Sequence, residues 1–202
     1  MDARRVVLAT GNPGKLRQFS ELLADTGLVL VRQSDFGIEP PPETGGTFLE
    51  NSLIKARNAA RLTALPAIAD DSGIEVDALD GRPGLYSARY AGEHASDEDN
   101  LRKMLRELAG VPAARRTARY RSVIVFLQGP DDAQPLVAEG LWEGAIAETP
   151  CGSGGFGYDP IFLPREERGT AAELSTERRN ELSHRGQAAR DFLAQLTRRS
   201  RT

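Results

Sequence analysis

Short apolar runs alternate with segments of helical periodicity, and this alternation limits the folds that the chain can adopt. Residues 6–9 form an apolar run that predicts a strand, and the run breaks at residues 11–14. Leucine and phenylalanine then recur at helical spacing over residues 16–23, and residues 28–31 predict a second strand. A strand, a loop, a helix and a strand in this order indicate an α/β protein.

The rest of the chain continues this pattern and adds a hairpin. Further predicted elements are helices capped by Thr47 and by Ser96, a strand over residues 74–79, strands over residues 121–128 and 136–147, and a last helix beyond Ser183. A Gly-Pro-Asp-Asp turn separates the two long strands, which therefore predict an antiparallel hairpin. We expect a mixed central sheet with flanking helices. Residues 1–197 form one domain in this interpretation, and residues 198–202 form a frayed basic tail.

Composition argues against several classes of function. The 202 residues suffice for one sizeable core, and 26 basic against 29 acidic side chains give a formal net charge of −3. No general attraction to nucleic acid or to membranes is therefore expected. Cys151 is the single cysteine, and with only His94 and His184 available neither a disulfide nor a zinc cluster is expected. Without a signal-like segment or a run of transmembrane length, the sequence predicts a soluble, cytoplasmic protein.

Two adjacent carboxylates, Asp70 and Asp71, follow an apolar run and are expected to end a buried strand where the chain turns. Like charges about 4 Å apart repel by roughly 4 kcal/mol at an effective dielectric near 20, so the pair needs a cation, a shared proton or strong hydrogen bonds. Oxygen ligands of this kind favour Mg²⁺. The alternative is that both residues only make an Asx turn before Gly73, with side chains that would alternate across a continuing strand.

The segment Thr10-Gly11-Asn12-Pro13-Gly14-Lys15 lies between a predicted strand and a predicted helix. Free backbone N–H groups and the positive end of the helix dipole favour an anion at such a place, and Lys15 adds a full charge. Ala9 and Leu16 stand where a Walker loop needs a glycine and a serine or threonine, so that motif is absent. The segment is either a phosphate-binding loop or a simple turn.

Three more polar residues are candidates for the same site. Asn51 and Lys55 fall opposite the apolar stripe of their predicted helix, where they either point into a cleft or are solvated. Glu43 follows a Pro-rich loop and joins Asp70 and Asp71 as a candidate metal ligand, although a single Glu in a loop is most often solvated.

Two later segments are suited to a nucleobase. Phe156, Gly157, Tyr158 and Asp159 bring two aromatic rings and a carboxylate onto a glycine-rich loop, although Phe156 is equally suited to the core. His184 and Arg185 open the last helix with donors suited to a keto oxygen, and the alternative is a Ser183 cap with two exposed basic residues. Carboxylates for a metal, a Gly/Lys loop for phosphates and an aromatic loop for a base together indicate a nucleoside polyphosphate.

These motifs, in this order and over nearly the whole chain, resemble those of the inosine/xanthosine triphosphate pyrophosphatases. The matching segments are TGNPGK at 10–15, TFLENSLIKA at 47–56, ADDSG at 69–73, PGLYSARY at 83–90, GGFGYDP at 154–160 and SHRG at 183–186. The resemblance implies two lobes around a nucleotide-binding cleft, a homodimer, and Mg²⁺-dependent hydrolysis of ITP, dITP or XTP to the monophosphate and pyrophosphate. Such an enzyme removes non-canonical purine nucleotides from the pool.

The resemblance also implies roles for individual residues. Asp71 would accept the proton of the attacking water and hold Mg²⁺ with Glu43 and Asp70. Substrate would be bound by Thr10, Gly11, Asn12, Pro13, Gly14, Lys15, Lys55, Ser72, Phe156, Gly157, Tyr158, Asp159, Arg179, His184 and Arg185. Donors near His184 and Arg185 would select a 6-keto purine, because adenine presents a donor there and would leave theirs unpaired.

This chain departs from the family pattern at two positions. Pro42-Glu43 stands where the family often has an acidic pair, and Arg179 replaces a lysine before the Ser-His-Arg motif. A planar guanidinium there presents a fork in place of a compact ammonium. Two other functions remain open: a pyrophosphatase with a different base preference, and a catalytically silent nucleotide- or RNA-binding module. The intact carboxylates and lysines argue against silence, and the acidic balance argues against RNA.

Overall fold

The computed structural model describes residues 4–199, and the chain divides there into two compact units. The first unit comprises residues 4–71, 122–140 and 185–199, and the second comprises residues 72–121 and 141–184. Three strands, at residues 67–76, 117–127 and 136–146, each contribute residues to both units. Among the described residues, no helix is both long and apolar enough to cross a membrane.

The described strands form one sheet in the order β2-β1-β3-β4-β5-β6. Their bounds are β1 Arg4–Leu8, β2 Leu28–Arg32, β3 Ala67–Val76, β4 Thr117–Leu127, β5 Leu136–Ile146 and β6 Phe162–Pro164. Strand β1 pairs in parallel with β2 and with β3, whereas β5 and β6 are antiparallel. The predicted α/β class with a mixed sheet is confirmed, and the short β6 is an element that its sequence did not indicate.

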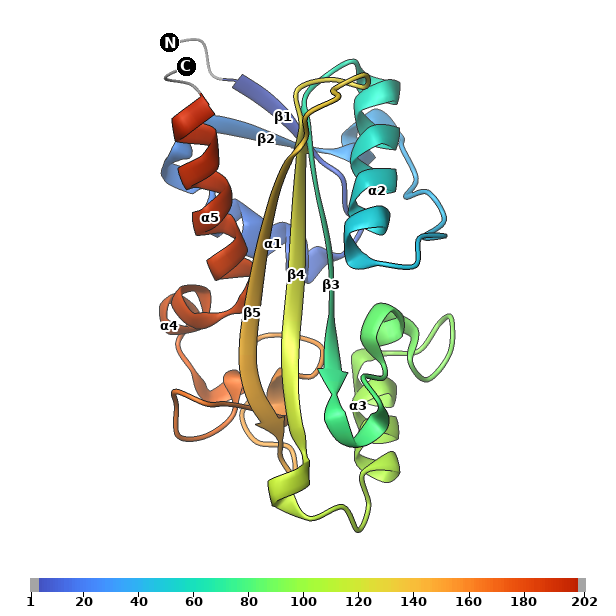
Figure 1. The fold of residues 1–202 in the computed structure, drawn as a ribbon, viewed down its shortest axis with the longest axis vertical. Helices are drawn as coiled ribbons and strands as arrows, with labels where there is room; N and C mark the ends of the chain where they lie inside the picture. Colours follow the sequence, from blue (N-terminus) through green and yellow to red (C-terminus); the bar gives the residue numbers. More distant parts are fainter. Residues whose placement is uncertain (1–3, 200–202) are drawn as a thin grey trace. The chain divides into compact units, whose positions relative to one another are not determined.

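Helices cover both faces of the sheet within the first unit (Figure 1). The described α-helices are α1 Pro13–Leu22, α2 Phe48–Thr63, α3 Asp97–Glu107, α4 Thr176–Leu182 and α5 His184–Arg199. Phe19 of α1 and Phe192 of α5 pack in one core cluster with Ile68 of β3, whereas alanines of α2 pack in another with Ala67 and Ala69. Successive residues of β3 therefore face α1 and α5 on one side and α2 on the other.

The second unit has its own aromatic core. Trp142 of β5 and Phe162 of β6 pack there with Tyr120 of β4, with ring centroids 4.8–6.3 Å apart. Met104 of α3 and Ile74 of β3 are buried in the same cluster. This core supports the strand ends and the loops that carry the aromatic candidate residues.

The expected turn at Asp70 and Asp71 was wrong, because β3 runs without interruption to Val76. Adjacent side chains of a strand point to opposite faces of the sheet. The charges of Asp70 and Asp71 are therefore kept apart without a turn. Gly73 allows the strand to continue, since a Cβ there would lie 2.2 Å from the backbone oxygen of Gly84. The strand interpretation of alternating side chains is the one that the structure supports.

Replacing Gly73 with alanine is expected to destabilise the protein by about 1–3 kcal/mol, the usual cost of overpacking a well-packed interior. The added methyl group would meet the Gly84 backbone and would lie 2.6 Å from the Ser87 hydroxyl oxygen. Urea unfolding monitored by circular dichroism measures the change. Gly129→Ala is the matched control, because nothing lies within 4 Å of a Cβ there; equal stability of the two variants would contradict the packing argument.

Helix α2 begins as predicted, and its buried surface extends beyond the predicted apolar stripe to Asn51 and Lys55. The Thr47 side chain accepts from the Glu50 backbone N–H at 3.1 Å, which confirms the predicted cap. Asn51 and Lys55 are buried, at 1% and 6% exposure, so the solvated interpretation of both residues was wrong. Small neighbours explain this, because the alanines of α2 let the helix approach the sheet closely enough to enclose the two longer side chains.

Helix α5 continues beyond the predicted start of the tail. Arg199 is its last residue, and the Arg199 guanidinium donates to the Gln134 backbone oxygen at 2.9 Å. Arg198 and Arg199 are therefore helical, in contrast to the predicted fraying. Residues 200–202 of that tail lie outside the described residues.

Candidate functional site

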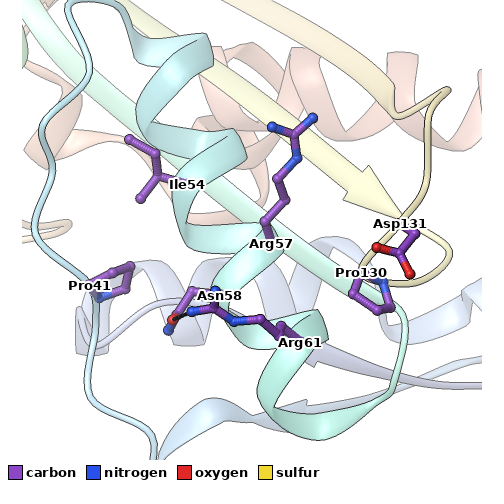
Figure 2. Close-up of a pocket in the computed structure, with 7 residues that line it drawn as sticks. All are labelled: Pro41, Ile54, Arg57, Asn58, Arg61, Pro130 and Asp131. Atoms are coloured by element: carbon purple, nitrogen blue, oxygen red, sulfur yellow. Dashed lines mark hydrogen bonds between the residues drawn. The ribbon is translucent and has the colours of Figure 1, made fainter.

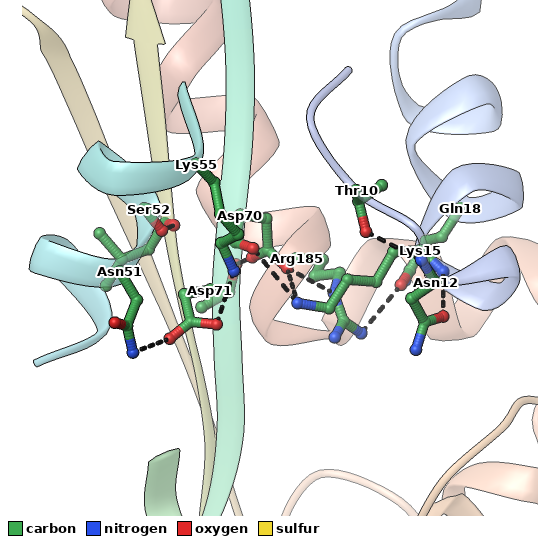
Figure 3. Close-up of polar contacts among 12 residues, drawn as sticks. Thr10, Asn12, Lys15, Gln18, Asn51, Ser52, Lys55, Asp70, Asp71 and Arg185 are labelled. Carbon is green, nitrogen blue, oxygen red and sulfur yellow. Dashed lines mark hydrogen bonds and ion pairs between the residues drawn. The ribbon is translucent and has the colours of Figure 1, made fainter. Parts of the chain in front are cut away.

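The alternation of β3 separates the two adjacent carboxylates and gives each its own cationic partner (Figure 3). Asp71 shares the face of Ala67 and Ala69, which pack against α2. Asp70 shares the face of Ile68, which packs with α1 and α5. One strand thus holds two acidic centres in the first unit.

Asp71 is held by two buried side chains of α2. Lys55 Nζ lies 2.8 Å from Asp71 Oδ1, and Asn51 Nδ2 donates to Asp71 Oδ2 at 3.2 Å. Lys55 Nζ also lies 3.0 Å from Glu43 Oε1. Asn51 is fixed in turn, because its side-chain oxygen accepts from the Gly45 backbone N–H at 2.8 Å. Asp71 is therefore held by one amide and one ammonium.

Burial raises the pKa of Asp71 above its ordinary value; the ammonium of Lys55 opposes the shift, and the negative charge of Glu43 adds to it. Burial lowers the pKa of Lys55, but the charges of Asp71 and Glu43 outweigh it and leave that pKa raised. A carboxylate with a raised pKa next to a fixed cation is typical of a general base.

Asp70 is the centre of a second, more deeply buried cluster. Lys15 Nζ lies 2.7 Å from Asp70 Oδ2, and Arg185 Nε lies 3.4 Å from the same oxygen. The Ser122 hydroxyl donates to Asp70 Oδ1, and Arg185 also donates to Gln18 Oε1 at 3.3 Å. Two cations converge here on one carboxylate of 1% exposure.

Burial alone would raise the pKa of Asp70, but the charges of Lys15 and Arg185 outweigh it and hold that pKa well below its usual range. Burial lowers the pKa of Lys15, with the attraction of Asp70 opposing the shift. Two cationic side chains meet at one carboxylate here. Such side chains are suited to an anionic ligand.

The predicted phosphate loop leads into this cluster. Asn12 caps α1, with its side-chain oxygen accepting from the Lys15 backbone N–H at 3.0 Å, and Pro13 is the first residue of the helix. The Asn12 backbone N–H donates to the Thr10 hydroxyl at 3.1 Å. Gly11 packs against the Pro-rich loop, since a Cβ there would lie 3.3 Å from Pro40. The loop is thus an ordered helix N-terminus with Lys15 turned toward Asp70.

A separate set of candidate residues belongs to the second unit. Asp159 is buried and accepts from the Phe156 backbone N–H at 3.1 Å and from the Tyr120 hydroxyl at 3.3 Å. His184 stacks on Tyr120 with ring centroids 4.6 Å apart and an interplanar angle of 5°. Tyr158 donates to the Ser87 backbone oxygen at 2.8 Å, so its hydroxyl is engaged inside the unit.

The remaining members of this set are less constrained. Phe156 is half-buried, and the Gly157 backbone N–H donates to Asp97 Oδ2 at 2.8 Å. Arg179 lies on α4. Its guanidinium lies close to Gly154, since a Cβ added to Gly154 would come within 3.2 Å of it. Ser72 is half-buried and follows Asp71 on β3. The candidate site residues that the sequence indicated therefore form two sets, and each set lies within one unit.

The three carboxylates expected to bind metal do not gather at one point. Among residues 4–199, no group of three or more His, Cys, Asp or Glu side chains is placed to hold a metal ion. Asp71 and Glu43 do share one cation, Lys55, whereas Asp70 lies with Lys15 and Arg185. The donor set that fits a hard divalent cation is thus Asp71 with Glu43, completed by water or substrate oxygens.

A pocket of about 530 Å³ lies on the outer side of α2, away from these carboxylates (Figure 2). Its lining residues are Pro41, Ile54, Arg57, Asn58, Arg61, Pro130 and Asp131. None of the predicted site residues is among them. This pocket therefore does not mark the predicted site.

Several contributors to the site were not predicted from the sequence. Gln18 and Ser122 contact the Asp70 cluster, and Tyr120 joins Asp159 to His184. Each lies on a helix or strand whose pattern only indicated packing. The sequence did offer a signal for such a residue. Ser122 is polar at a strand position that was expected to be apolar, directly before the apolar residues 123–127.

Comparison with known proteins identifies the class. The model of the Ham1 family matches residues 6–195, and the chain therefore belongs to the Ham1 family. The resemblance drawn from the motifs is thereby confirmed.

The chain is similar to curated proteins over nearly its full length. It is 57% identical to the "dITP/XTP pyrophosphatase" of Thioalkalivibrio sulfidiphilus over 192 residues, covering 95% of this chain and 98% of that protein. It is 54% identical to the protein of the same name from Shigella flexneri over 193 residues, covering 96% and 98%.

Solved structures show the same fold. A HAM1 protein from Coxiella burnetii is 44% identical with a TM-score of 0.88, and the match covers 96% of this chain and 99% of that one. The Ham1 protein of Staphylococcus aureus is 40% identical with a TM-score of 0.84, covering 96% and 98%.

Proposed function

We propose that this protein hydrolyses non-canonical purine nucleoside triphosphates, namely ITP, dITP and XTP, to the monophosphate and pyrophosphate. The observation that carries the proposal is the Asp71 centre, where a buried carboxylate of raised pKa meets Lys55 and Asn51. The names of the relatives, which are dITP/XTP pyrophosphatases, support the same activity.

The triphosphate is bound by the cations and backbone donors of the first unit. Lys15 at the start of α1 supplies positive charge, and the backbone N–H groups of Gly11 and Gly14 supply hydrogen bonds for phosphate oxygens. Lys55 neutralises a further phosphate. Arg185 was expected near the base, but in this proposal it adds a guanidinium beside Lys15, because both contact Asp70. Asp70 serves in this arrangement as the residue that positions the two cations.

The fit of a divalent cation rests on the donor set of Asp71 and Glu43, whose oxygens already lie close enough to share one ammonium. These two residues would hold Mg²⁺, which favours carboxylate and phosphate oxygens. When bound, the ion neutralises charge that develops on the phosphates. Asp70 was expected to join them, but its contacts favour the positioning role.

Asp71 acts as the general base. It takes a proton from a water molecule whose oxygen bonds to the α-phosphorus, while the bond from that phosphorus to the bridging oxygen breaks and pyrophosphate leaves. Asn51 keeps the carboxylate oriented through its amide. Lys55 and Lys15 stabilise the negative charge of the phosphates during this displacement.

Activity is expected to fall on acidification at a higher pH than an exposed aspartate would give. The base must be ionised, and the pKa of Asp71 is raised above the ordinary value of about 3.9. The sign follows directly: kcat/KM, which reports the free enzyme, rises with pH through this pKa and levels off above it. A kcat/KM profile between pH 4 and 8 measures the midpoint, and a profile that stays flat down to about pH 4 would contradict the assignment.

The second unit supplies the base-recognition residues in this proposal. Phe156 offers a half-buried ring for stacking, and Asp159 is held by Tyr120 and by the Phe156 backbone. His184, stacked on Tyr120, offers ring nitrogens for a 6-keto oxygen. An adenine base would leave such donors unpaired, at a cost of about 1–3 kcal/mol each. The other contacts assigned to the substrate come from Ser72, Gly157, Tyr158 and Arg179.

The same proposal includes a cytoplasmic homodimer. Its physiological role is the removal of deaminated purine nucleotides before they are used.

Product analysis tests the proposed function. Purified protein is incubated with ITP, with and without Mg²⁺, and the products are resolved by anion-exchange chromatography. Metal-dependent IMP and pyrophosphate are expected, with ATP turned over at least about 10-fold more slowly, as loss of one or two hydrogen bonds predicts. IDP with inorganic phosphate would place the reaction at another phosphorus, and no turnover of any nucleotide would favour a silent binding module.

A further inference from the structure

Lys55 stands between the two carboxylates that are best placed to bind a divalent cation. Its Nζ lies 2.8 Å from Asp71 Oδ1 and 3.0 Å from Glu43 Oε1. The Lys55 side chain is 8% exposed and that of Asp71 is also 8% exposed, so the contact is shielded from solvent. An ammonium therefore occupies the position that brings the two carboxylates together.

A metal ion and this ammonium compete for the same oxygens. A second cation arriving beside an unmoved Lys55 would meet a like charge at short range, which is unfavourable in a partly buried site. Moving Lys55 away without a new partner would leave a buried cation uncompensated, which is also costly. Neither route is favourable while the protein is free of nucleotide.

A triphosphate resolves this competition, because it offers Lys55 another anionic partner. The side chain is long and can exchange a carboxylate for a phosphate oxygen by rotating about its own bonds. Its departure frees Asp71 and Glu43 for the metal. The same triphosphate supplies further oxygen ligands, which Mg²⁺ uses in preference to an all-protein cage.

We infer that Lys55 is an internal counter-ion that keeps the metal site closed until a nucleotide binds, so that divalent metal enters only together with the triphosphate. The inference rests on the proposed function, since it assigns Asp71 and Glu43 to the metal. Its consequence for the reaction is a binding order. Free metal binds weakly to the free protein, and metal and nucleotide strengthen each other's binding.

Mn²⁺ binding to the protein without nucleotide tests the inference, with electron paramagnetic resonance reporting free Mn²⁺ directly. Lys55→Met removes the ammonium and keeps the length of the side chain. Arg57→Gln is the matched control, because it removes one positive charge from the exposed outer side of the same helix (Figure 2). The two variants have the same net charge, so general electrostatics affects both alike.

Lys55→Met is expected to bind Mn²⁺ at least 10-fold more tightly than the unaltered protein in the absence of nucleotide, and Arg57→Gln less than 3-fold more tightly. For the unaltered protein, an ITP analogue with a methylene group between the α- and β-phosphorus is expected to tighten Mn²⁺ binding at least 10-fold, after subtraction of the Mn²⁺ that the analogue binds in a titration without protein. Equal Mn²⁺ affinity of Lys55→Met and the unaltered protein would overturn the inference. So would tight Mn²⁺ binding that the analogue leaves unchanged.

A second readout covers the case in which Lys55→Met is poorly folded without metal. Thermal unfolding then shows a larger rise of Tm with Mn²⁺ for Lys55→Met than for the unaltered protein, because the metal replaces the missing cation. An equal rise in both would count against the counter-ion role. Failure of the proposed function is distinguishable: it appears as absent ITP hydrolysis by the unaltered protein, whatever the Mn²⁺ affinities are.

Discussion

Replacing Asp71 with asparagine is expected to lower kcat for ITP by about 10²- to 10⁴-fold, the range typical of removing a general base. Asparagine has nearly the same shape, so it can still accept from Asn51, and Lys55 keeps Glu43 as a partner. What the substitution removes is the charge and the ability to take a proton. Steady-state kinetics measures the loss, and circular dichroism measures whether the fold is retained.

A control separates the loss of a base from a general loss of acidic charge. Asp131→Asn changes the same group in the exposed turn between β4 and β5, away from the Asp71 centre. Its kcat is expected to stay within about 2-fold of the unaltered value, since surface substitutions of this kind change little. A folded Asp71→Asn protein that retains most of its turnover would remove Asp71 from the role of base.

Replacing Asp70 with asparagine is expected to destabilise the fold by about 3–5 kcal/mol, the cost of breaking a buried ion pair by removing one partner. Lys15 and Arg185 would then face each other without a carboxylate between them. Arg185 is only 6% exposed, so burial gives its guanidinium no easy route to water, and the Lys15 side chain is 13% exposed. Urea unfolding at pH 7 measures the change.

The exposed Asp77 provides the comparison. It pairs with Arg119 at 2.9 Å, but its side chain is 44% exposed, so Asp77→Asn is expected to cost no more than about 1 kcal/mol. Similar losses for the two variants would show that Asp70 does not act as a buried counter-charge.

The same buried carboxylate, Asp70, predicts the pH dependence of stability. Because the folded pKa of Asp70 is lowered, its contribution is present above the unfolded pKa of about 3.9 and is lost as the pH falls below that value. The unaltered protein is therefore expected to lose stability below about pH 4 more steeply than Asp70→Asn. Parallel acid limbs in urea unfolding at pH 3–7 would contradict this linkage.

Local patterns were sufficient for most of the fold. Thr47 and Ser96 cap helices as predicted, and the apolar runs of β1, β2 and β5 lie where strands were expected. These features depend on neighbours a few residues apart, which a single sequence displays directly. Elements with weak local signals, such as the three-residue β6, depend on pairing with β5 and were not foreseen.

The Asp70–Asp71 pair shows why the site was harder to predict. Adjacent charges indicated a turn, because the cations that allow a continuous strand are remote in sequence: Lys15 is 55 residues and Arg185 115 residues from Asp70. The solvated alternative stayed open for Lys55 for a similar reason, since its partner Asp71 is 16 residues further on. Long-range electrostatics thus overrode local propensity at the centre of the site.

The role of Asp71 predicts which phosphorus is attacked, and isotope labelling tests this most directly. ITP is hydrolysed in water enriched in ¹⁸O, and mass spectrometry locates the label in the products. The account predicts one ¹⁸O in the phosphate of IMP and none in pyrophosphate, because water attacks the α-phosphorus. Label in pyrophosphate with unlabelled IMP would mean attack at the β-phosphorus and would contradict the assignment of Asp71.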